Sequence, residues 1–264
     1  IFFIKAFFSS GTSLFILTGP IYLSSLLFSK SSKHVLYEHS DPFTLSLLHH
    51  SKLKSFLYIT ACKKADKIIV VNNLVKRKME FYLKKNGVTK NVTVLNNPVN
   101  KITKNKSFYN GNGFSSFNNF IIIGRNSSEK NIGTAYSYIK NNFSPNNITI
   151  ITDMLPKYIL EDEIVTFYKD YCDVSTKIDV SDYILVNFCN VETFGLVISE
   201  WLSAGGIVYS VYSVTLSSLW SKYRGFHFFN SGDLNIAYNF DSRPKLQPDN
   251  SSYFKDFEEL LFNE

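Results

Sequence analysis

The chain has 264 residues, of which 45% are hydrophobic and 19% are charged, and its net charge is +6. This length allows one large domain or two smaller ones, and the apolar content excludes a disordered or collagen-like polymer. Three scattered cysteines exclude a disulfide-rich scaffold and a CxxC zinc site, so a reducing compartment such as the cytoplasm is expected.

The charge is divided unevenly along the chain. Residues 1–106 hold 17 Lys and Arg against 4 Asp and Glu, a net charge of +13, whereas the remaining residues hold 11 against 18, a net charge of −7. Such a basic first part favours an anionic partner, such as a membrane surface, a nucleic acid or a phosphorylated substrate. The polar stretch 100–119 has the composition of a linker, so we expect a domain boundary near residue 105.

An uncharged run over residues 6–29 is long enough to raise the question of a transmembrane segment. Two glycines and a proline interrupt it, and these breaks favour a buried strand over 14–17, a turn at 18–20 and then a packed helix. No basic segment and no small-residue cleavage site precedes the run, which argues against a signal peptide.

Short apolar runs bounded by turn residues recur along the rest of the chain and predict buried strands. They cover residues 34–37, 67–71, 92–95, 120–123, 148–151, 164–167, 183–186 and 207–209. Helices are expected over 44–63, 74–85, 131–141, 157–163, 195–204 and 253–262. The alternation predicts an α/β fold with parallel sheets, whose ligands bind beyond the carboxyl ends of the strands.

The helix expected around residues 73–85 reads NLVKRKMEFYLKK and mixes apolar and aromatic residues with five cations. Two interpretations stay open: a basic amphipathic helix on a lipid surface, or a helix packed on the core with an ordinary solvated face. Nucleic acid would also attract this charge, but no recognisable nucleic-acid module accompanies it, so no nucleic-acid partner is expected.

The loop after the strand over 120–123 brings two cations, Arg125 and Lys130, to the start of a helix. Backbone N–H groups, the helix dipole and charge-assisted hydrogen bonds make such a place suited to phosphate. The structural alternative is that Ser127 or Ser128 caps the helix while Glu129 offsets Lys130 on a solvated face.

The next polar junction carries two carboxylates, Glu192 and Glu200, eight residues apart. If both were helical, they would lie roughly 12 Å apart along the axis, too far to share a proton and close to the span of a nucleotide sugar. Gly195 at the helix start would let a ligand phosphate approach the backbone. The alternative is a surface helix with Glu200 in solvent, and the apolar neighbours of Glu200 weigh against it.

These segments, in this order and spacing, resemble the retaining glycosyltransferases of the GT-B fold, the group 1 or family four type that includes sucrose and trehalose synthases. ETFGLVISE, residues 192–200, resembles the E-x7-E signature of that family, and IIIGRNSSEKNI resembles its G-R-x-x-x-E-K-G segment. ADKIIVVNNLVKRKM and VTVLNNPVN, within residues 65–100, resemble the end of its first domain and the crossing to its second. The resemblance covers roughly residues 32–232.

The resemblance implies two Rossmann-like domains with parallel sheets. It places a partial acceptor-side domain at 1–105, a nucleotide-sugar donor domain at 106–252 and a terminal helix that could cross back at 253–264. The N-terminal domain is expected to be incomplete, because the family's opening strand and Gly-rich loop are absent. The chain also starts at Ile1 rather than at methionine, which fits an N-terminal truncation.

The resemblance further implies an activity: transfer of a sugar, with retention and without a metal or cofactor, from a nucleotide-diphosphate sugar to a glycan or lipid-linked acceptor. The missing Asp-x-Asp motif fits metal-independent chemistry. An acceptor on a membrane would place the basic N-terminal part at the cytoplasmic membrane face, with the protein attached peripherally.

The roles that the resemblance implies fall on eight residues. Arg125 and Lys130, with Gly124 and the backbone of Gly195 and Leu196, would bind the donor diphosphate. Glu200 would accept hydrogen bonds from the ribose, and Glu192 would hold the transferred sugar. His39, in YEHSDPF, stands where the family places a His near the reacting sugar, the alternative being a structural His at a strand end.

The sequence also departs from the family. Asn72 and Asn73 replace a usual Ser, Ile207 replaces a usual Pro, and TDMLPK stands where a Gly-rich turn is expected. Two other functions therefore stay open: a non-catalytic GT-B-like subunit or binding module, and a GT-B sugar-nucleotide epimerase, which needs no membrane acceptor.

Overall fold

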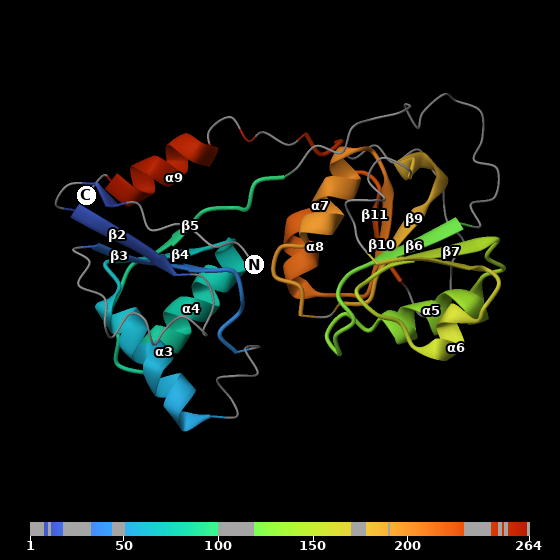
Figure 1. The fold of residues 1–264 in the computed structure, drawn as a ribbon. Helices are drawn as coiled ribbons and strands as arrows, with labels where there is room; N and C mark the ends of the chain where they lie inside the picture. The colour runs from blue at the N-terminus through green and yellow to red at the C-terminus, as the bar shows by residue number, and fades with distance from the viewer. Residues whose placement is uncertain are drawn as a thin grey trace. The chain divides into compact units, whose positions relative to one another are not determined.

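The computed structural model describes residues 8–9, 12–17, 33–43, 51–99, 119–169, 178–189, 191–229, 244–247, 250 and 253–262. The chain forms two compact units, one of residues 1–98 and 250–264 and one of residues 99–249, and each contains its own sheet (Figure 1). The boundaries expected at residues 105 and 252 fall outside the described residues and stay predictions.

The first unit holds a five-stranded sheet in the order β1-β2-β3-β4-β5. Its strands are β1 (Phe8–Ser9), β2 (Thr12–Leu17), β3 (Lys33–Glu38), β4 (Lys67–Val70) and β5 (Val92–Val94). Only β1 pairs antiparallel; from β2 to β5 all pairs are parallel, with Leu36 opposite Ile68 and Ile68 opposite Val92. Leu36 and Ile68 have no exposed surface, as expected for a parallel sheet covered on both faces.

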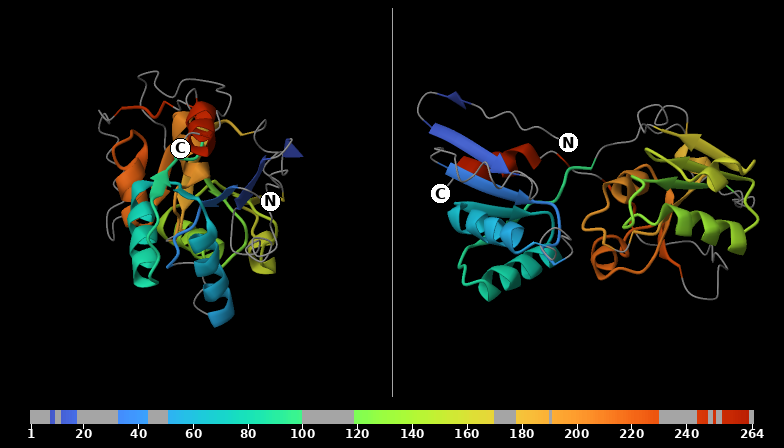
Figure 2. Two further views of the ribbon diagram at one scale, coloured as in Figure 1. Left: turned by 90° about the vertical axis from the view of Figure 1, so that its left-hand side faces the viewer. Right: turned by 60° about the horizontal axis from the view of Figure 1, so that its bottom comes forward.

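Among the described residues of this unit, three helices cover the sheet: α3 (Lys52–Lys64), α4 (Asn73–Lys85) and α9 (Tyr253–Phe262). Figures 1 and 2 show α3 and α4 together on one face and α9 on the other. The alternation of side chains along β3 explains this, because Tyr37 contacts Phe257 of α9 whereas Glu38 contacts Tyr58 of α3. The last helix of the chain therefore belongs to the first unit.

Helix α4 buries its apolar side chains in this unit. Val75, Met79, Tyr82 and Leu83 are buried, and the Asn72 side chain caps the helix by accepting from the N–H of Val75 at 2.9 Å. The apolar face of α4 therefore agrees with the interpretation as a helix packed on the core.

The second unit holds a six-stranded parallel sheet in the order β11-β10-β9-β6-β7-β8. Its strands are β6 (Asn119–Ile123), β7 (Asn147–Ile151), β8 (Val165–Tyr168), β9 (Ile184–Asn187), β10 (Ile207–Ser210) and β11 (Phe226–Phe228). Phe120 of β6 pairs with Ile148 on one side and with Ile184 on the other. The chain thus runs outward from β6 to β8 and returns to the opposite side of β6 at β9.

In the part of this unit that the structure describes, four helices cover the sheet: α5 (Ile132–Asn142), α6 (Lys157–Leu160), α7 (Leu196–Ser203) and α8 (Val214–Trp220). Phe120 and Ile122 of β6 share one core cluster with residues of α5 and α6, such as Ile139 and Ile159. Helices α7 and α8 lie on the opposite face (Figure 1).

All the expected strands are present, each within two residues of its expected bounds. Several helices differ. Helix α3 begins at Lys52 and residues 44–50 lie outside the described part, α6 ends at Leu160 instead of residue 163, and α8 was not expected at all. Within the uncharged N-terminal run, β2 contains the strand expected over 14–17, whereas the turn and helix after it fall outside the described residues. No described helix is both long and apolar enough to span a bilayer.

Candidate functional site

The candidate site lies where the strand order of the second sheet reverses. Strands β6 and β9 are parallel neighbours, so the loops that follow them, 124–131 and 188–195, leave the same edge of the sheet. In open α/β sheets this reversal point opens a crevice for ligands, because the two loops diverge to opposite faces.

The loop after β6 places Lys130 against the backbone. Gly124 ends the strand, and a Cβ added to it would lie 3.4 Å from Cδ of Lys130, so the lysine stem packs directly on this glycine. Arg125 is exposed, and it is near enough to Lys130 for its charge to oppose protonation of Lys130. The two predicted cations are therefore brought together.

The N-cap of α5 is Asn131, so neither Ser127 nor Ser128 caps this helix. Asn131 has a left-handed backbone with φ of 50° and makes no side-chain cap; its Nδ2 donates to the carbonyl oxygen of Phe188 at 3.3 Å. Asparagine tolerates this conformation far better than most residues other than glycine. Its side chain thus ties the start of α5 to the loop after β9.

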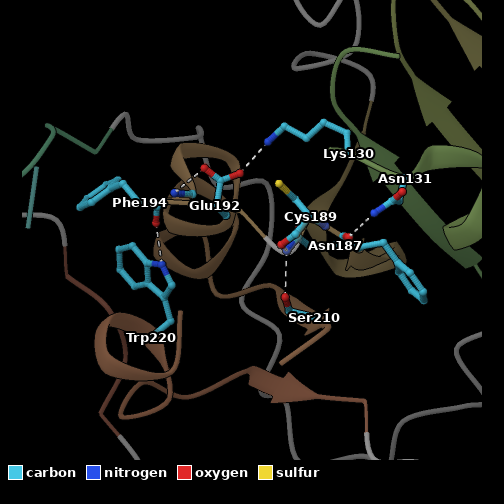
Figure 3. Close-up of polar contacts among 10 residues, drawn as sticks. Lys130, Asn131, Asn187, Cys189, Glu192, Phe194, Ser210 and Trp220 are labelled. Atoms are coloured by element: carbon cyan, nitrogen blue, oxygen red, sulfur yellow. Dashed lines mark hydrogen bonds and ion pairs between the residues drawn. The ribbon is translucent and has the colours of Figure 1, made fainter. Parts of the chain in front are cut away.

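The partner of Lys130 is Glu192, and the structural alternative, in which Glu129 offsets Lys130 on a solvated face, is wrong. Nζ of Lys130 lies 2.6 Å from Oε2 of Glu192, while Oε1 of Glu192 accepts from the backbone N–H of Gly195 at 3.2 Å (Figure 3). Burial lowers the pKa of Lys130, but the adjacent Glu192 carboxylate outweighs burial, and the pKa is raised.

Helix α7 begins after Glu192, so the 12 Å axial spacing expected for two helical carboxylates does not apply. Gly195 is its N-cap, with φ of 76°, and as a glycine it has no side chain with which to cap the helix. The backbone N–H groups of the first turn have no partner within the helix, and that of Gly195 donates to Glu192, the partner of Lys130.

Glu200 lies within α7 and is only 8% exposed. The alternative of a surface helix with Glu200 in solvent is therefore wrong. Its neighbours Ser199 and Trp201 are buried as well. A carboxylate on such a helix is costly unless it is hydrogen-bonded.

The loop that carries Glu192 is held by residues that the sequence analysis did not single out. Nε1 of Trp220 in α8 donates to the carbonyl oxygen of Phe194 at 2.8 Å, and the two rings meet edge to face (Figure 3). Nδ2 of Asn187 donates to Oγ of Ser210 at 2.8 Å, which joins the ends of β9 and β10. The one sequence signal for this support is Trp220, a large aromatic residue in a segment for which no helix or strand was predicted.

His39 lies in the first unit, directly after β3. It is half-buried, its ring lies 4.4 Å from that of Tyr37, and burial lowers its pKa. In the part of the chain that the structure describes, no group of three or more His, Cys, Asp or Glu side chains could hold a metal ion.

No family model and no curated protein matches the sequence. Solved structures share its fold. TarM superposes on 95% of the chain with a TM-score of 0.64 at 14% identity. The sucrose-phosphate synthase of Thermosynechococcus elongatus covers 83% with a TM-score of 0.59 at 15% identity, and Anabaena HepE, in complex with UDP and glucose, covers 80% with a TM-score of 0.58 at 16% identity.

The chain spans 55%, 61% and 63% of the lengths of these three proteins. The likeness confirms the expected fold class, which is the α/β GT-B fold with two parallel-strand sheets.

Proposed function

We propose that the protein is a glycosyltransferase that moves a sugar from a nucleoside-diphosphate sugar to an acceptor hydroxyl. One observation carries the proposal: Arg125 and Lys130 lie at the strand-order reversal of a GT-B unit, where Glu192 joins Lys130 to the N-terminus of α7. HepE, which shares this fold, was solved in complex with UDP and glucose, and this supports a UDP-type donor.

The cations and the helix would stabilise the leaving diphosphate. As the bond from the anomeric carbon to the phosphate oxygen breaks, negative charge grows on that oxygen. Lys130 and Arg125 neutralise this charge together with the backbone N–H groups of Gly195 and Leu196, which do the work that a metal ion does in other transferases. The acceptor oxygen bonds to the same face of the sugar, which gives retention, and its proton passes to the leaving phosphate.

The carboxylates would orient the donor. Glu192 accepts hydrogen bonds from the transferred sugar, and the buried Glu200 accepts them from the ribose hydroxyls. Glu200 is buried and Glu192 is half-buried, which favours this role, because a desolvated carboxylate binds hydroxyl groups more strongly than one in water. For His39 we propose the role that the family resemblance implies, next to the transferred sugar.

A glycan or lipid-linked acceptor is the second part of the proposal. Helices α3 and α4 expose Leu53, Phe56 and Phe81, each more than 60%, among lysines. Exposed apolar side chains among cations suit an anionic lipid surface, which would hold the protein peripherally on the cytoplasmic membrane face.

The test is calorimetric titration of the 264-residue chain with a panel of nucleoside diphosphates. Lys130→Ala and Glu200→Ala should each weaken binding of the preferred nucleotide at least tenfold, whereas the control Lys157→Ala, which removes an exposed lysine paired with Glu161, should leave it unchanged. Unchanged affinity in the first two variants overturns the proposal.

Product analysis separates the alternative functions. Incubation of the chain with acceptors and the sugar nucleotide whose nucleoside diphosphate it binds should release that nucleoside diphosphate. Binding without release would favour a non-catalytic subunit, and an altered sugar nucleotide would favour an epimerase.

A further inference from the structure

Two buried carboxylates accept hydrogen bonds from the backbone of the loop that carries His39, and neither takes part in the proposed chemistry. Glu38, the last residue of β3, is 1% exposed and Asp41 is 3% exposed. Oε1 of Glu38 accepts from the backbone N–H of Ser40 at 3.0 Å, and Oδ1 of Asp41 accepts from that of Phe43 at 2.8 Å.

Each carboxylate also reaches a different helix. Oε2 of Glu38 accepts from the hydroxyl of Tyr58 in α3 at 3.1 Å, and Oδ2 of Asp41 forms an ion pair with Lys78 of α4. The backbone on both sides of His39 is therefore fixed to the two helices under the sheet.

The ring of His39 has its own support. It lies against the ring of Tyr37. The Tyr37 hydroxyl has two acceptors, the carbonyl oxygen of Leu95 at 3.3 Å and Oδ1 of Asn97 at 3.2 Å. The imidazole of His39 is therefore restricted by the ring of Tyr37 and by the loop backbone that Glu38 and Asp41 hold.

The fold does not need a carboxylate between β3 and α3. An apolar side chain of similar size would fill that place without the cost of removing a charge from water, which burial of Glu38 incurs. What the carboxylate adds, and an apolar side chain cannot, is the hydrogen bond to the loop.

We propose that Glu38 is a positioning residue, which holds the loop after β3 so that His39 presents its imidazole to the substrate. This inference rests on the proposed function, because only there does His39 contact a substrate. Ionised Glu38 accepts from both Ser40 and Tyr58. In protonated Glu38 one oxygen carries a hydrogen that needs an acceptor of its own, so the hold on the loop loosens.

Glu38 changes charge in the neutral pH range. Burial raises its pKa to about 7, against the opposing effect of the hydrogen bonds from Ser40, Tyr58 and His39. The titratable groups that face it from α3, Tyr58 and Cys62, have pKa values raised by burial and stay neutral there. From α4, Tyr82 is also neutral, and Lys78 is paired with Asp41.

The test is NMR of the 264-residue chain with labelled histidine, of which there are five residues, and with the His39 signal assigned from the spectrum of His39→Gln. In the wild type the His39 signal should show its own titration, whose pKa burial lowers, and a second step between pH 6 and 8 that follows Glu38. Only this second step should be lost in Glu38→Gln. Glu80→Gln, which removes an exposed carboxylate of α4, is the matched control and should titrate like the wild type.

A second variant guards against loss of folding. Tyr58→Phe keeps the ring and removes one hydrogen bond to Glu38, so it should move the His39 titration without abolishing it. Identical His39 titrations in the wild type, Glu38→Gln and Tyr58→Phe would overturn the positioning role.

Kinetics then separate this inference from the proposed function. Glu38→Gln should lower kcat at least tenfold, while the affinity for the nucleoside diphosphate, bound in the other unit, stays unchanged. A wild-type chain without transfer would contradict the proposed function, and the NMR result would still decide whether Glu38 positions His39.

Discussion

Replacement of Glu192 by glutamine should tighten the binding of a nucleoside diphosphate, although Glu192 belongs to the candidate site. The Glu192 carboxylate lies 2.6 Å from Nζ of Lys130, and a diphosphate has to compete with it for this ammonium group. Glutamine keeps the size and one oxygen but removes the negative charge, so Lys130 becomes available and the repulsion of phosphate falls.

The size of the effect follows from the pair's exposure. A charge-assisted hydrogen bond contributes about 1.5 to 3 kcal/mol when shielded from water. The Lys130 and Glu192 side chains are 29% and 18% exposed, so solvent screening reduces this value to about 1 kcal/mol. Because 1.4 kcal/mol corresponds to a tenfold change, the Kd should fall about fivefold.

The assay is calorimetric titration with UDP, in which wild type, Glu192→Gln, Lys130→Ala and Glu161→Gln are compared. Glu161 is an exposed carboxylate of the same unit, paired with Lys157, and its replacement should change nothing. The two members of the ion pair should act in opposite directions, since Lys130→Ala weakens binding. Equal or weaker binding of UDP by Glu192→Gln would refute the competition.

Three further results are expected. Asn131→Val should unfold in urea with a free energy about 1 to 2 kcal/mol lower than Asn131→Gly, because a β-branched residue resists the left-handed backbone with φ of 50°. Gly195→Ala should weaken UDP binding and lower the melting temperature, because its φ is 76° and the new Cβ would lie 3.0 Å from Cδ1 of Ile198. The pKa of Glu38 is raised from 4.5 to about 7 in the folded state, so the free energy of unfolding of the wild type should fall by about 3 kcal/mol, relative to that of Glu38→Gln, as the pH rises from below 4.5 to above about 7. Between these two values the folded state binds more protons than the unfolded state, and urea unfolding at a series of pH values should show this loss.

The strands could be predicted because parallel sheets leave a direct trace in the sequence. Runs such as 120–123 and 148–151 are apolar without alternation, since both of their faces are covered. The short elements leave no such trace. Helix α8 reads VTLSSLW, where two serines interrupt the apolar pattern, and it is recognised only when the Ser213 cap and the contact of Trp220 with Phe194 are seen.

The sequence singles out Lys130 and Glu192 as candidate residues, but it does not show that they contact each other. Lys130 and Glu192 are 62 residues apart, and their ion pair depends on β9 returning to lie beside β6. Sequence spacing favoured Glu129 as the partner of Lys130, because neighbours along the chain are the only contacts that a sequence shows. The left-handed Asn131 did have a signal, since it stands where the resembled motif has glycine.

The distribution of charge supports two separate anionic partners. The candidate phosphate site lies in the part of the chain with net charge −7, so its attraction for phosphate comes from Arg125, Lys130 and the N-terminus of α7 at contact distance. We expect the net charge of +13 in residues 1–106, which acts over longer distances, to attract the anionic lipid of the proposed membrane contact. The Debye length falls from about 10 Å at 0.1 M salt to about 3 Å at 1 M. High salt should therefore release the chain from anionic lipid vesicles in a sedimentation assay while UDP binding weakens far less. An equal loss of both would mean that one charged surface serves both ligands.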